Sequence, residues 1–131
     1  MMSHFLKRRF VAGLFLVFCL PILGCGGGVS APVSDVSTAE ALVRETLDAW
    51  KAGKSAADLK GQSPAVYFAE DLIVKGVALQ GYSLDSAGEV YGTNIRFDVS
   101  LKCSDQREGE KTHKVRYLVC TTPACCISRE E

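Results

Sequence analysis

Apolar residues recur three and four positions apart between residues 38 and 52, and charged residues fill the positions between them. The apolar positions are Ala39, Leu42, Val43, Leu47 and Trp50. This spacing gathers them on one side of a helix, so we predict an amphipathic helix over residues 38–52. Ser37 and Glu40 fit the capping box S-x-x-E, which makes Ser37 the expected N-cap, and Gly53 is expected to end the helix. Residues 55–60 are expected to form one further short helical turn.

A strict alternation of period two begins further along the chain, at residues 94–103. Its apolar positions are Ile95, Phe97, Val99, Leu101 and Cys103, and the polar positions between them are Arg96, Asp98, Ser100 and Lys102. Such alternation predicts a strand with one buried face and one polar face. After a polar loop at residues 104–110 the alternation resumes with Val115, Tyr117 and Val119. We therefore predict that the two strands form an antiparallel hairpin.

The segments between and after these elements have weaker patterns. Residues 72–84 favour a strand, with a bend or bulge at the two glycines they contain. The adjacent acids Glu70 and Asp71 are interpreted as a solvated turn. Pro123 interrupts the strand pattern near the end of the chain, so residues 125–129 are expected to form a last edge segment.

The order of these elements predicts the fold class. One helix followed by several antiparallel strands is typical of an α+β domain in which the helix covers the apolar face of the sheet. We expect the N-terminal helix to pack on a small antiparallel sheet of about three to four strands. The predicted domain spans residues 37–131.

The chain begins with the layout of a secretory signal. Residues 1–9 carry three basic side chains and no acid, and residues 10–23 contain no charge. A charged start, an apolar run and a small residue before the cut are typical of a signal peptide. The apolar run is shorter than the roughly 20 residues that a membrane-spanning helix requires. We predict that residues 1–24 form a signal-peptide helix that is removed.

The residues Ile22, Leu23, Gly24 and Cys25 end this segment and resemble the lipobox of bacterial lipoproteins. In that family, signal peptidase II cuts before the cysteine, and the cysteine sulfur receives a diacylglyceryl group. The resemblance implies that Cys25 is the lipidated N-terminus of the mature chain. Gly24 and Gly26 supply small flanking residues, whereas the family usually prefers Leu at the position of Ile22 and a small residue at that of Leu23. Acyl chains contribute about 0.8 kcal/mol per buried methylene, so two or more chains anchor a protein stably.

Residues 25–36 are expected to connect this anchor to the domain. Gly26 to Asp35 holds three glycines, two serines and one proline, a composition typical of a tether. The expected partner is the lipid bilayer of a bacterial membrane, with the domain facing the periplasm or the exterior. Gly26 stands where the family's inner-membrane retention signal has Asp, which leaves the outer membrane open as the destination.

Charge excludes one class of partner. The 131-residue chain has 15 basic and 15 acidic side chains, and loss of the three basic residues of the signal leaves the mature chain net acidic. Nucleic-acid binding requires a basic stripe, so no nucleic-acid partner is expected.

Four cysteines are left in the mature chain besides Cys25, because Cys19 lies in the removed segment. They are Cys103, Cys120, Cys125 and Cys126. An exported, oxidising setting favours disulfides among them. Alternate residues of a strand face opposite sides of the sheet, which places Cys103 on the apolar face and Cys120 on the polar face. This difference disfavours a bridge between these two cysteines across the hairpin. Cys125 or Cys126 therefore has to supply the partner of any bridge, and these two neighbours point to opposite faces if their segment is extended.

The sequence contains no P-loop, G-x-S-x-G, H-E-x-x-H or dinucleotide fingerprint, so no cofactor and no catalytic residue is assigned. His113 shares parity with Val115 and is expected on the core side near the hairpin tip. We expect a binding or envelope-structural module, with an envelope protein or a small ligand as its partner, rather than an enzyme. One alternative is an NTF2-like enzyme with a pocket between helix and sheet. Another is a thiol or metal site formed by Cys103, Cys120, Cys125, Cys126 and His113.

Three segments carry a fold-level resemblance. They are LDAWKAGKS (47–55), VYFAEDLIVKGVALQGY (66–82) and RYLVCTTPACCISRE (116–130). These resemble small lipoproteins of planctomycete-type bacteria, and the order of elements is similar to a cystatin-like or NTF2-like arrangement. The resemblance implies no particular activity, because such folds serve binding, structural and enzymatic functions.

Overall fold

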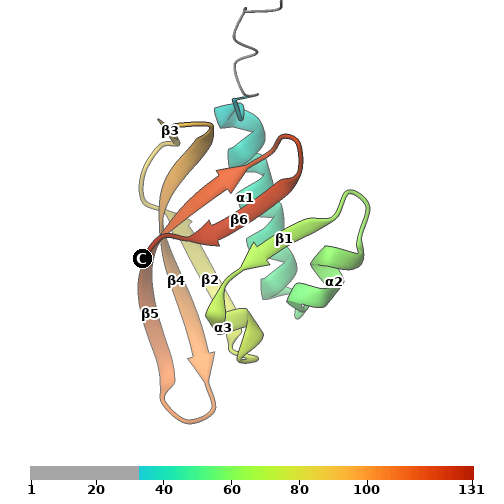
Figure 1. Cartoon of the computed structure of the whole chain (residues 1–131). Helices are drawn as coiled ribbons and strands as arrows, with labels where there is room; N and C mark the ends of the chain where they lie inside the picture. The colour runs from blue at the N-terminus through green and yellow to red at the C-terminus, as the bar shows by residue number, and fades with distance from the viewer. Residues whose placement is uncertain (1–32) are drawn as a thin grey trace, which may run out of the picture.

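A long helix lies across one face of a six-stranded sheet (Figure 1). The computed structural model describes residues 33–131, and the expected signal-peptide helix lies outside them. The helices are α1 (Val36–Lys51), α2 (Ala56–Gly61) and α3 (Asp71–Val74). The strands are β1 (Val66–Ala69), β2 (Ala78–Leu84), β3 (Glu89–Tyr91), β4 (Asn94–Asp105), β5 (Gly109–Cys120) and β6 (Cys125–Arg129). The predicted α+β class, with an N-terminal helix on a sheet, is confirmed.

The sheet is larger than predicted and is mixed. Its order is β1-β6-β5-β4-β2, with β3 paired to β4 beside β2, and β1 runs parallel to β6 while the other pairs are antiparallel. The expectation of about three to four antiparallel strands is therefore wrong. The strands that it missed are β1 and β3, which have four and three residues. Runs of this length are too short to display a periodic pattern.

The β4–β5 hairpin is confirmed, and it forms the centre of the sheet. Phe97 faces Tyr117 across the pair, and the next register position joins Asp98 to Arg116. The side chains of Phe97 and Tyr117 are fully buried, whereas Arg116 is exposed. The alternation seen in the sequence thus separates a core face from a polar face.

The helix ends differ from the prediction in one respect. The N-cap of α1 is Asp35, not Ser37, because the Asp35 carboxylate accepts hydrogen bonds from the Thr38 backbone N–H at 3.0 Å and from the Ser37 hydroxyl at 2.6 Å. A carboxylate at this position also interacts favourably with the helix dipole. The short second helix is confirmed as α2, with a capping box formed by Ser55 and Asp58.

Two predictions for the second half of the chain are wrong. Residues 72–84 do not form one strand, because α3 occupies Asp71–Val74 and β2 begins only at Ala78. Residues 125–129 form β6, which is no edge segment, since it lies between β5 and β1. Pro123 lies in the turn before β6, so it removes no hydrogen bond from the strand itself.

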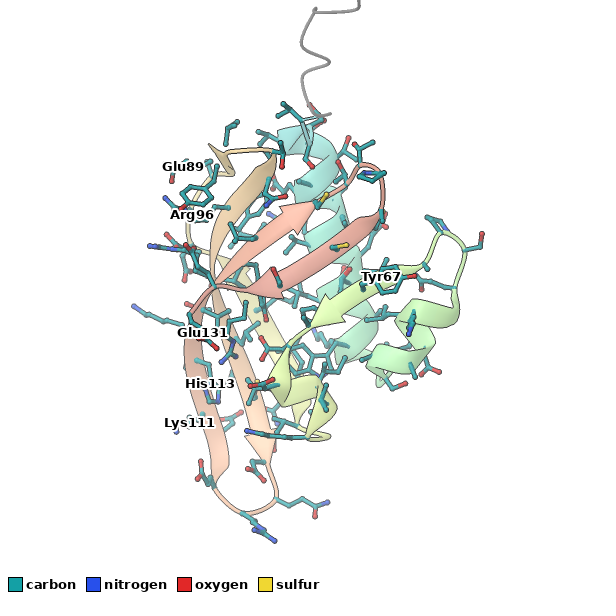
Figure 2. All side chains as sticks on the ribbon, viewed as in Figure 1. Tyr67, Glu89, Arg96, Lys111, His113 and Glu131 are labelled. Carbon is teal, nitrogen blue, oxygen red and sulfur yellow. The ribbon has the colours of Figure 1, made fainter. Side chains whose placement is uncertain are left out.

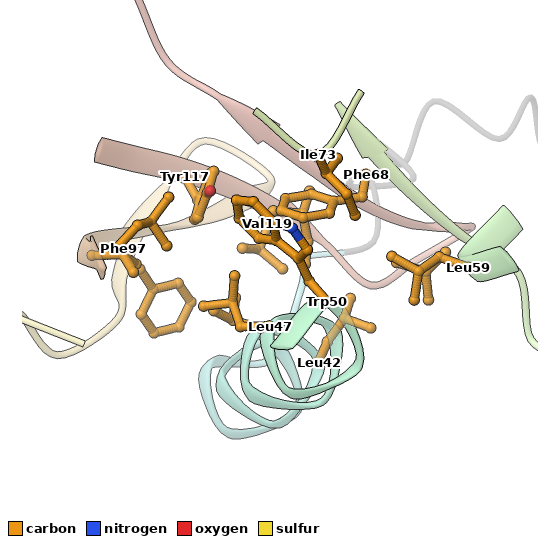
Figure 3. Packing of buried hydrophobic residues seen from close by; sticks show 14 of the residues in the cluster. Leu42, Leu47, Trp50, Leu59, Phe68, Ile73, Phe97, Tyr117 and Val119 are labelled. Atoms are coloured by element: carbon orange, nitrogen blue, oxygen red, sulfur yellow. The ribbon is translucent and has the colours of Figure 1, made fainter. Parts of the chain in front are cut away.

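The space between α1 and the sheet is filled by aromatic and aliphatic side chains (Figure 3). Trp50 of α1 packs edge-on against Phe68 with ring centroids 5.9 Å apart, and Phe68 packs in the same way against Tyr117 at 5.7 Å. The indole N–H of Trp50 donates a hydrogen bond to the Val77 carbonyl at 2.9 Å. Leu47 and Phe97 are completely enclosed beside this row. Close packing of this kind fixes the helix on the sheet.

The described chain enters the fold through a buried serine. The Ser34 backbone N–H donates to the Thr93 carbonyl at 3.2 Å, and the Ser34 hydroxyl accepts from the Thr121 N–H at 2.9 Å. These contacts tie the start of α1 to the β3–β4 and β5–β6 turns, at the opposite end of the molecule from the β4–β5 tip (Figure 1). Among residues 33–131, no helix is long and apolar enough to cross a membrane.

Candidate functional site

The sheet face opposite α1 carries a shallow polar groove. Arg96, Asp98, Lys114 and Arg116 project there because they alternate with buried residues on β4 and β5. Three of these residues, Asp98, Lys114 and Arg116, line a depression with a volume of about 670 Å³, which we call the polar-face groove. It is lined by Asp85, Asp98, Val99, Lys114, Val115, Arg116, Arg129, Glu130 and Glu131. The groove therefore presents both signs of charge to solvent.

Ion pairs run along one side of the polar-face groove. Arg116 Nε lies 2.8 Å from Asp98 Oδ1, its cross-strand partner, and 4.0 Å from Glu130 Oε2. Glu130 also approaches Arg96 at 3.7 Å, and Arg96 contacts Glu89 at 3.3 Å (Figure 2). The Glu130 backbone N–H donates to the Arg116 carbonyl at 2.8 Å, which holds the end of the chain on this face.

Hydrogen bonds favour the charged forms of two groups in the polar-face groove, Arg116 and Asp85. The hydrogen bond to Asp98, and then its charge, raise the pKa of Arg116 above its ordinary value. The hydroxyls of Ser100 and Ser83 donate to Asp85 and lower the pKa of that carboxyl. Both signs of charge consequently persist at neutral pH, and the groove suits a polar partner that carries complementary charges.

A buried carboxylate lies on the other side of the sheet. Glu70 is 1% exposed, and it is the N-cap of α3, accepting from the Leu72 N–H at 3.1 Å. The Tyr117 hydroxyl donates to Glu70 Oε2 at 2.5 Å, and Arg129 Nε donates to the same oxygen at 3.2 Å. Arg129 Nη2 lies 2.7 Å from Oε1, a charge contact without hydrogen-bond geometry. The interpretation of Glu70 as a solvated turn residue is wrong.

Each partner of Glu70 comes from a different element. Tyr117 and Arg129 are register partners on β5 and β6, and both point to the core side of the sheet. Glu70 reaches them because β1, which it follows, pairs with β6. A buried carboxylate requires such partners, since an unpaired charge in an apolar interior is strongly unfavourable. Both Glu70 oxygens are occupied, so this cluster is a structural ion pair that joins α3 to the sheet.

The cluster changes the acidity of two neighbours. Burial, and then the charge of Glu70, raise the pKa of the Tyr117 hydroxyl far above its usual range. Burial, followed by the same charge, raises the pKa of the Cys103 thiol, which is 1% exposed. A thiol with a raised pKa and no exposure is a poor nucleophile. Cys103 is therefore a packing residue.

The shifted pKa of Tyr117 predicts a loss of stability in alkali. The unfolded tyrosine releases its proton at a pKa of about 10, whereas the folded one keeps its proton. The contribution of protonated Tyr117 is fully present below about pH 10, and it decreases above that by about 1.4 kcal/mol per pH unit. Free energies of unfolding from urea titrations between about pH 8 and pH 11 should show this decrease above about pH 10 and no such decrease below it. We expect a smaller slope for Tyr117→Phe.

Tyr67→Phe is the matched control for this measurement. Tyr67 lies on β1 with 48% of its surface exposed, and we expect this variant to keep the wild-type slope. Equal slopes for wild type and Tyr117→Phe would contradict the role of the buried hydroxyl.

The thiols and the histidine do not form a single site. His113 pairs with Leu101 on the core side of the hairpin, as predicted, and lines a cavity of about 190 Å³ together with Cys103 and Lys111 (Figure 2). The other three cysteines lie at or beyond the opposite end of β5. Within residues 33–131, no three His, Cys, Asp or Glu side chains are placed to hold a metal ion. The cavity is also smaller than the roughly 300–1,000 Å³ of typical small-molecule sites.

The prediction of opposite faces for Cys125 and Cys126 is confirmed. Cys125 packs against the core beside Val66, whereas Cys126 belongs to the other face. The predicted lipidation residue Cys25 and its lipobox, Ile22 to Gly24, lie outside the described residues.

Together the fold and the site define a small α+β domain with a packed interior, a paired buried glutamate and a charged groove on its open sheet face. Comparison with protein-family models, curated proteins and solved structures finds no match to this chain.

Proposed function

We propose that this chain is an exported lipoprotein, held at a bacterial membrane by lipid on Cys25, whose domain is a binding module for an envelope protein. The observation that carries the binding role is the polar-face groove, which is open, charged with both signs and opposite the helix-covered face. Proteins that recognise one another through charged surfaces use complementary pairs for specificity and for fast association.

The entry point of the chain supports this arrangement. Ser34 is held between the turns that contain Thr93 and Thr121, so the proposed tether joins the domain at this end. The polar-face groove lies along the sheet rather than at that end, and it includes Lys114 in the half of β5 toward the hairpin tip. A partner in the envelope thus reaches the groove while the domain is tethered to the bilayer.

The packed interior favours binding over the NTF2-like enzyme. Such an enzyme needs a pocket between helix and sheet. Here Trp50, Phe97 and Tyr117 occupy that space, and the buried carboxylate of Glu70 has partners on both oxygens. A carboxylate engaged in this way is not poised to accept a proton from a substrate.

Site-specific photo-crosslinking in intact cells tests the binding role. A photoreactive residue replaces Lys114, which lines the polar-face groove, in the full-length chain. We expect one discrete adduct with an envelope protein, weakened as ionic strength increases, because exposed charges are screened by salt. The charge reversal Arg116→Glu in the same chain should remove most of this adduct.

Lys51 provides the matched control position, because it is an exposed lysine in the last turn of α1, on the helix-covered side of the sheet. No adduct is expected there. The same adduct pattern from both positions, or none from Lys114, would sink the proposal that the polar-face groove binds a partner.

A further inference from the structure

Two of the four cysteines among residues 33–131 face each other across the end of the sheet. Cys120 is the last residue of β5, and its register partner on the antiparallel strand β6 is Cys126. Residues directly opposite in an antiparallel pair have Cα atoms about 4.5–5.5 Å apart. A disulfide requires Cα atoms about 4.4–6.8 Å apart, so the backbone already holds these two cysteines at bridging distance.

The side chains of this pair also share a face. Val119 and Ile127, the neighbouring register pair, are buried in the core, so Cys120 and Cys126 project to the opposite side of the sheet. Both cysteines are half-buried. Burial, and then the charges of the neighbouring Cys120 and Cys125 thiols, raise the pKa of Cys126.

The remaining cysteines are poor competitors. Cys103 pairs with Lys111 near the hairpin tip, on the order of 30 Å along the strands from Cys120 at about 3.3 Å per residue. Cys125 is opposite Val66 and packs against the core, so its side chain points away from Cys120. Neither places its Cβ toward a partner thiol, as a disulfide requires.

We propose that Cys120 and Cys126 form a disulfide that closes the β5–β6 turn. The reaction requires a disulfide oxidant, such as a dithiol oxidase of the envelope or glutathione disulfide. One protein thiolate attacks a sulfur of the oxidant and releases a thiol, and the second protein thiolate then attacks the mixed disulfide and releases the other. The two protein thiols lose two protons and two electrons, and the oxidant is reduced to two thiols. The bridge in cells rests on the proposed export, because the cytosol keeps thiols reduced.

The bridge would reinforce the strand on which β1 depends. In the described fold β1 pairs only with β6, and Arg129 at the end of β6 holds Glu70. A covalent link at the start of β6 therefore limits the separation of β6, β1 and α3 from the rest of the sheet. A disulfide stabilises a fold mainly by restricting the unfolded chain, and the loop from Cys120 to Cys126 is short. We therefore expect reduction of the bridge to lower the melting temperature by roughly 10 °C.

Differential alkylation of the full-length chain tests the pairing. Cells are quenched in acid, free thiols in the denatured chain are blocked with iodoacetamide, and bridged thiols are then reduced and labelled with N-ethylmaleimide. Trypsin leaves Cys120, Cys125 and Cys126 together on the peptide 117–129, where fragmentation assigns each label. We expect N-ethylmaleimide on Cys120 and Cys126, and iodoacetamide on Cys125 and Cys103. N-ethylmaleimide on either of the latter two would overturn the pairing.

A second arm separates the pairing from the compartment. Full-length chain is purified in detergent under reducing conditions and then exposed to glutathione disulfide. Cys125→Ser should form the bridge and keep the higher melting temperature, whereas Cys126→Ser should lose both. Failure of Cys125→Ser to form the bridge in this arm would refute the geometry. If the bridge forms in this arm but is absent from cells, the pairing geometry stands and the disulfide in cells is refuted. That outcome would also count against the proposed export of the chain.

Discussion

Replacing Cys25 with serine is expected to abolish lipid labelling of the chain and to leave the uncleaved precursor in the cell. The reason is chemical, because the resemblance to lipoproteins implies that the Cys25 sulfur receives the lipid and that signal peptidase II cuts before this residue. A serine hydroxyl is far less nucleophilic than a thiolate, so the lipid is not transferred. Metabolic labelling with a radioactive fatty acid, together with the electrophoretic size of the chain, measures both effects.

Cys19→Ser is the control for this experiment. Cys19 is a second thiol in the same N-terminal segment, six residues before Cys25, and the lipobox resemblance gives it no role. We expect normal labelling and normal processing of this variant. Equal labelling of wild type and Cys25→Ser would show that the chain is not anchored through Cys25.

The second large effect concerns stability. Arg129→Met is expected to lower the free energy of unfolding by about 3 kcal/mol, because it removes the cation from a carboxylate that has no access to water. The Glu70 side chain is fully buried, and Arg129 is itself 32% exposed, which places the loss at the lower end of the range for broken buried pairs. Urea unfolding followed by circular dichroism measures this loss.

Arg116→Met provides a matched comparison. Arg116 also pairs with a carboxylate, Asp98 at 2.8 Å, but about half of each side chain is exposed. Exposed ion pairs contribute little to stability, so we expect little or no loss for this variant. Glu70→Gln in the Arg129→Met background should recover part of the loss, since it removes the uncompensated charge. Equal losses for the two arginine variants would refute the distinction between the buried and the exposed pair.

Periodic segments of sequence were sufficient to predict the central elements. The spacing from Ala39 to Trp50 and the alternation from Ile95 to Cys103 each extend over several repeats, and both elements are present as expected. The strand parity of His113 was also confirmed. These predictions succeeded because a side chain's face depends only on its position within a regular element.

Glu70 illustrates what local pattern misses. Beside Asp71 it has the composition of a solvated turn, yet it is almost completely buried. Its partners Tyr117 and Arg129 come from strands more than forty residues away. The only sign of this burial in the sequence was the run of apolar residues on both sides of Glu70, from Val66 to Val74. An acid within an apolar run is a reason to search for a distant cation.

The cysteines also show which features alternation along a strand predicts and which depend on strand pairing. Parity alone disfavoured a Cys103–Cys120 bridge and placed Cys125 and Cys126 on opposite faces. It could not choose the partner of Cys120, because that choice depends on which strand lies beside β5 and in which register. The β5–β6 pairing makes Cys126 the opposite residue.

The sequence by itself determined the α+β class, the amphipathic helix, the central hairpin and the residues that face the core. It also determined the prediction of a lipid anchor at Cys25, which depends on a short linear motif. The tertiary structure alone decided that β6 lies inside the sheet, that Glu70 is paired in the interior and that Cys120 faces Cys126. The physical reason is distance along the chain: periodicity reports how each residue relates to its own element, whereas strand order, ion pairs and disulfides depend on contacts between remote segments.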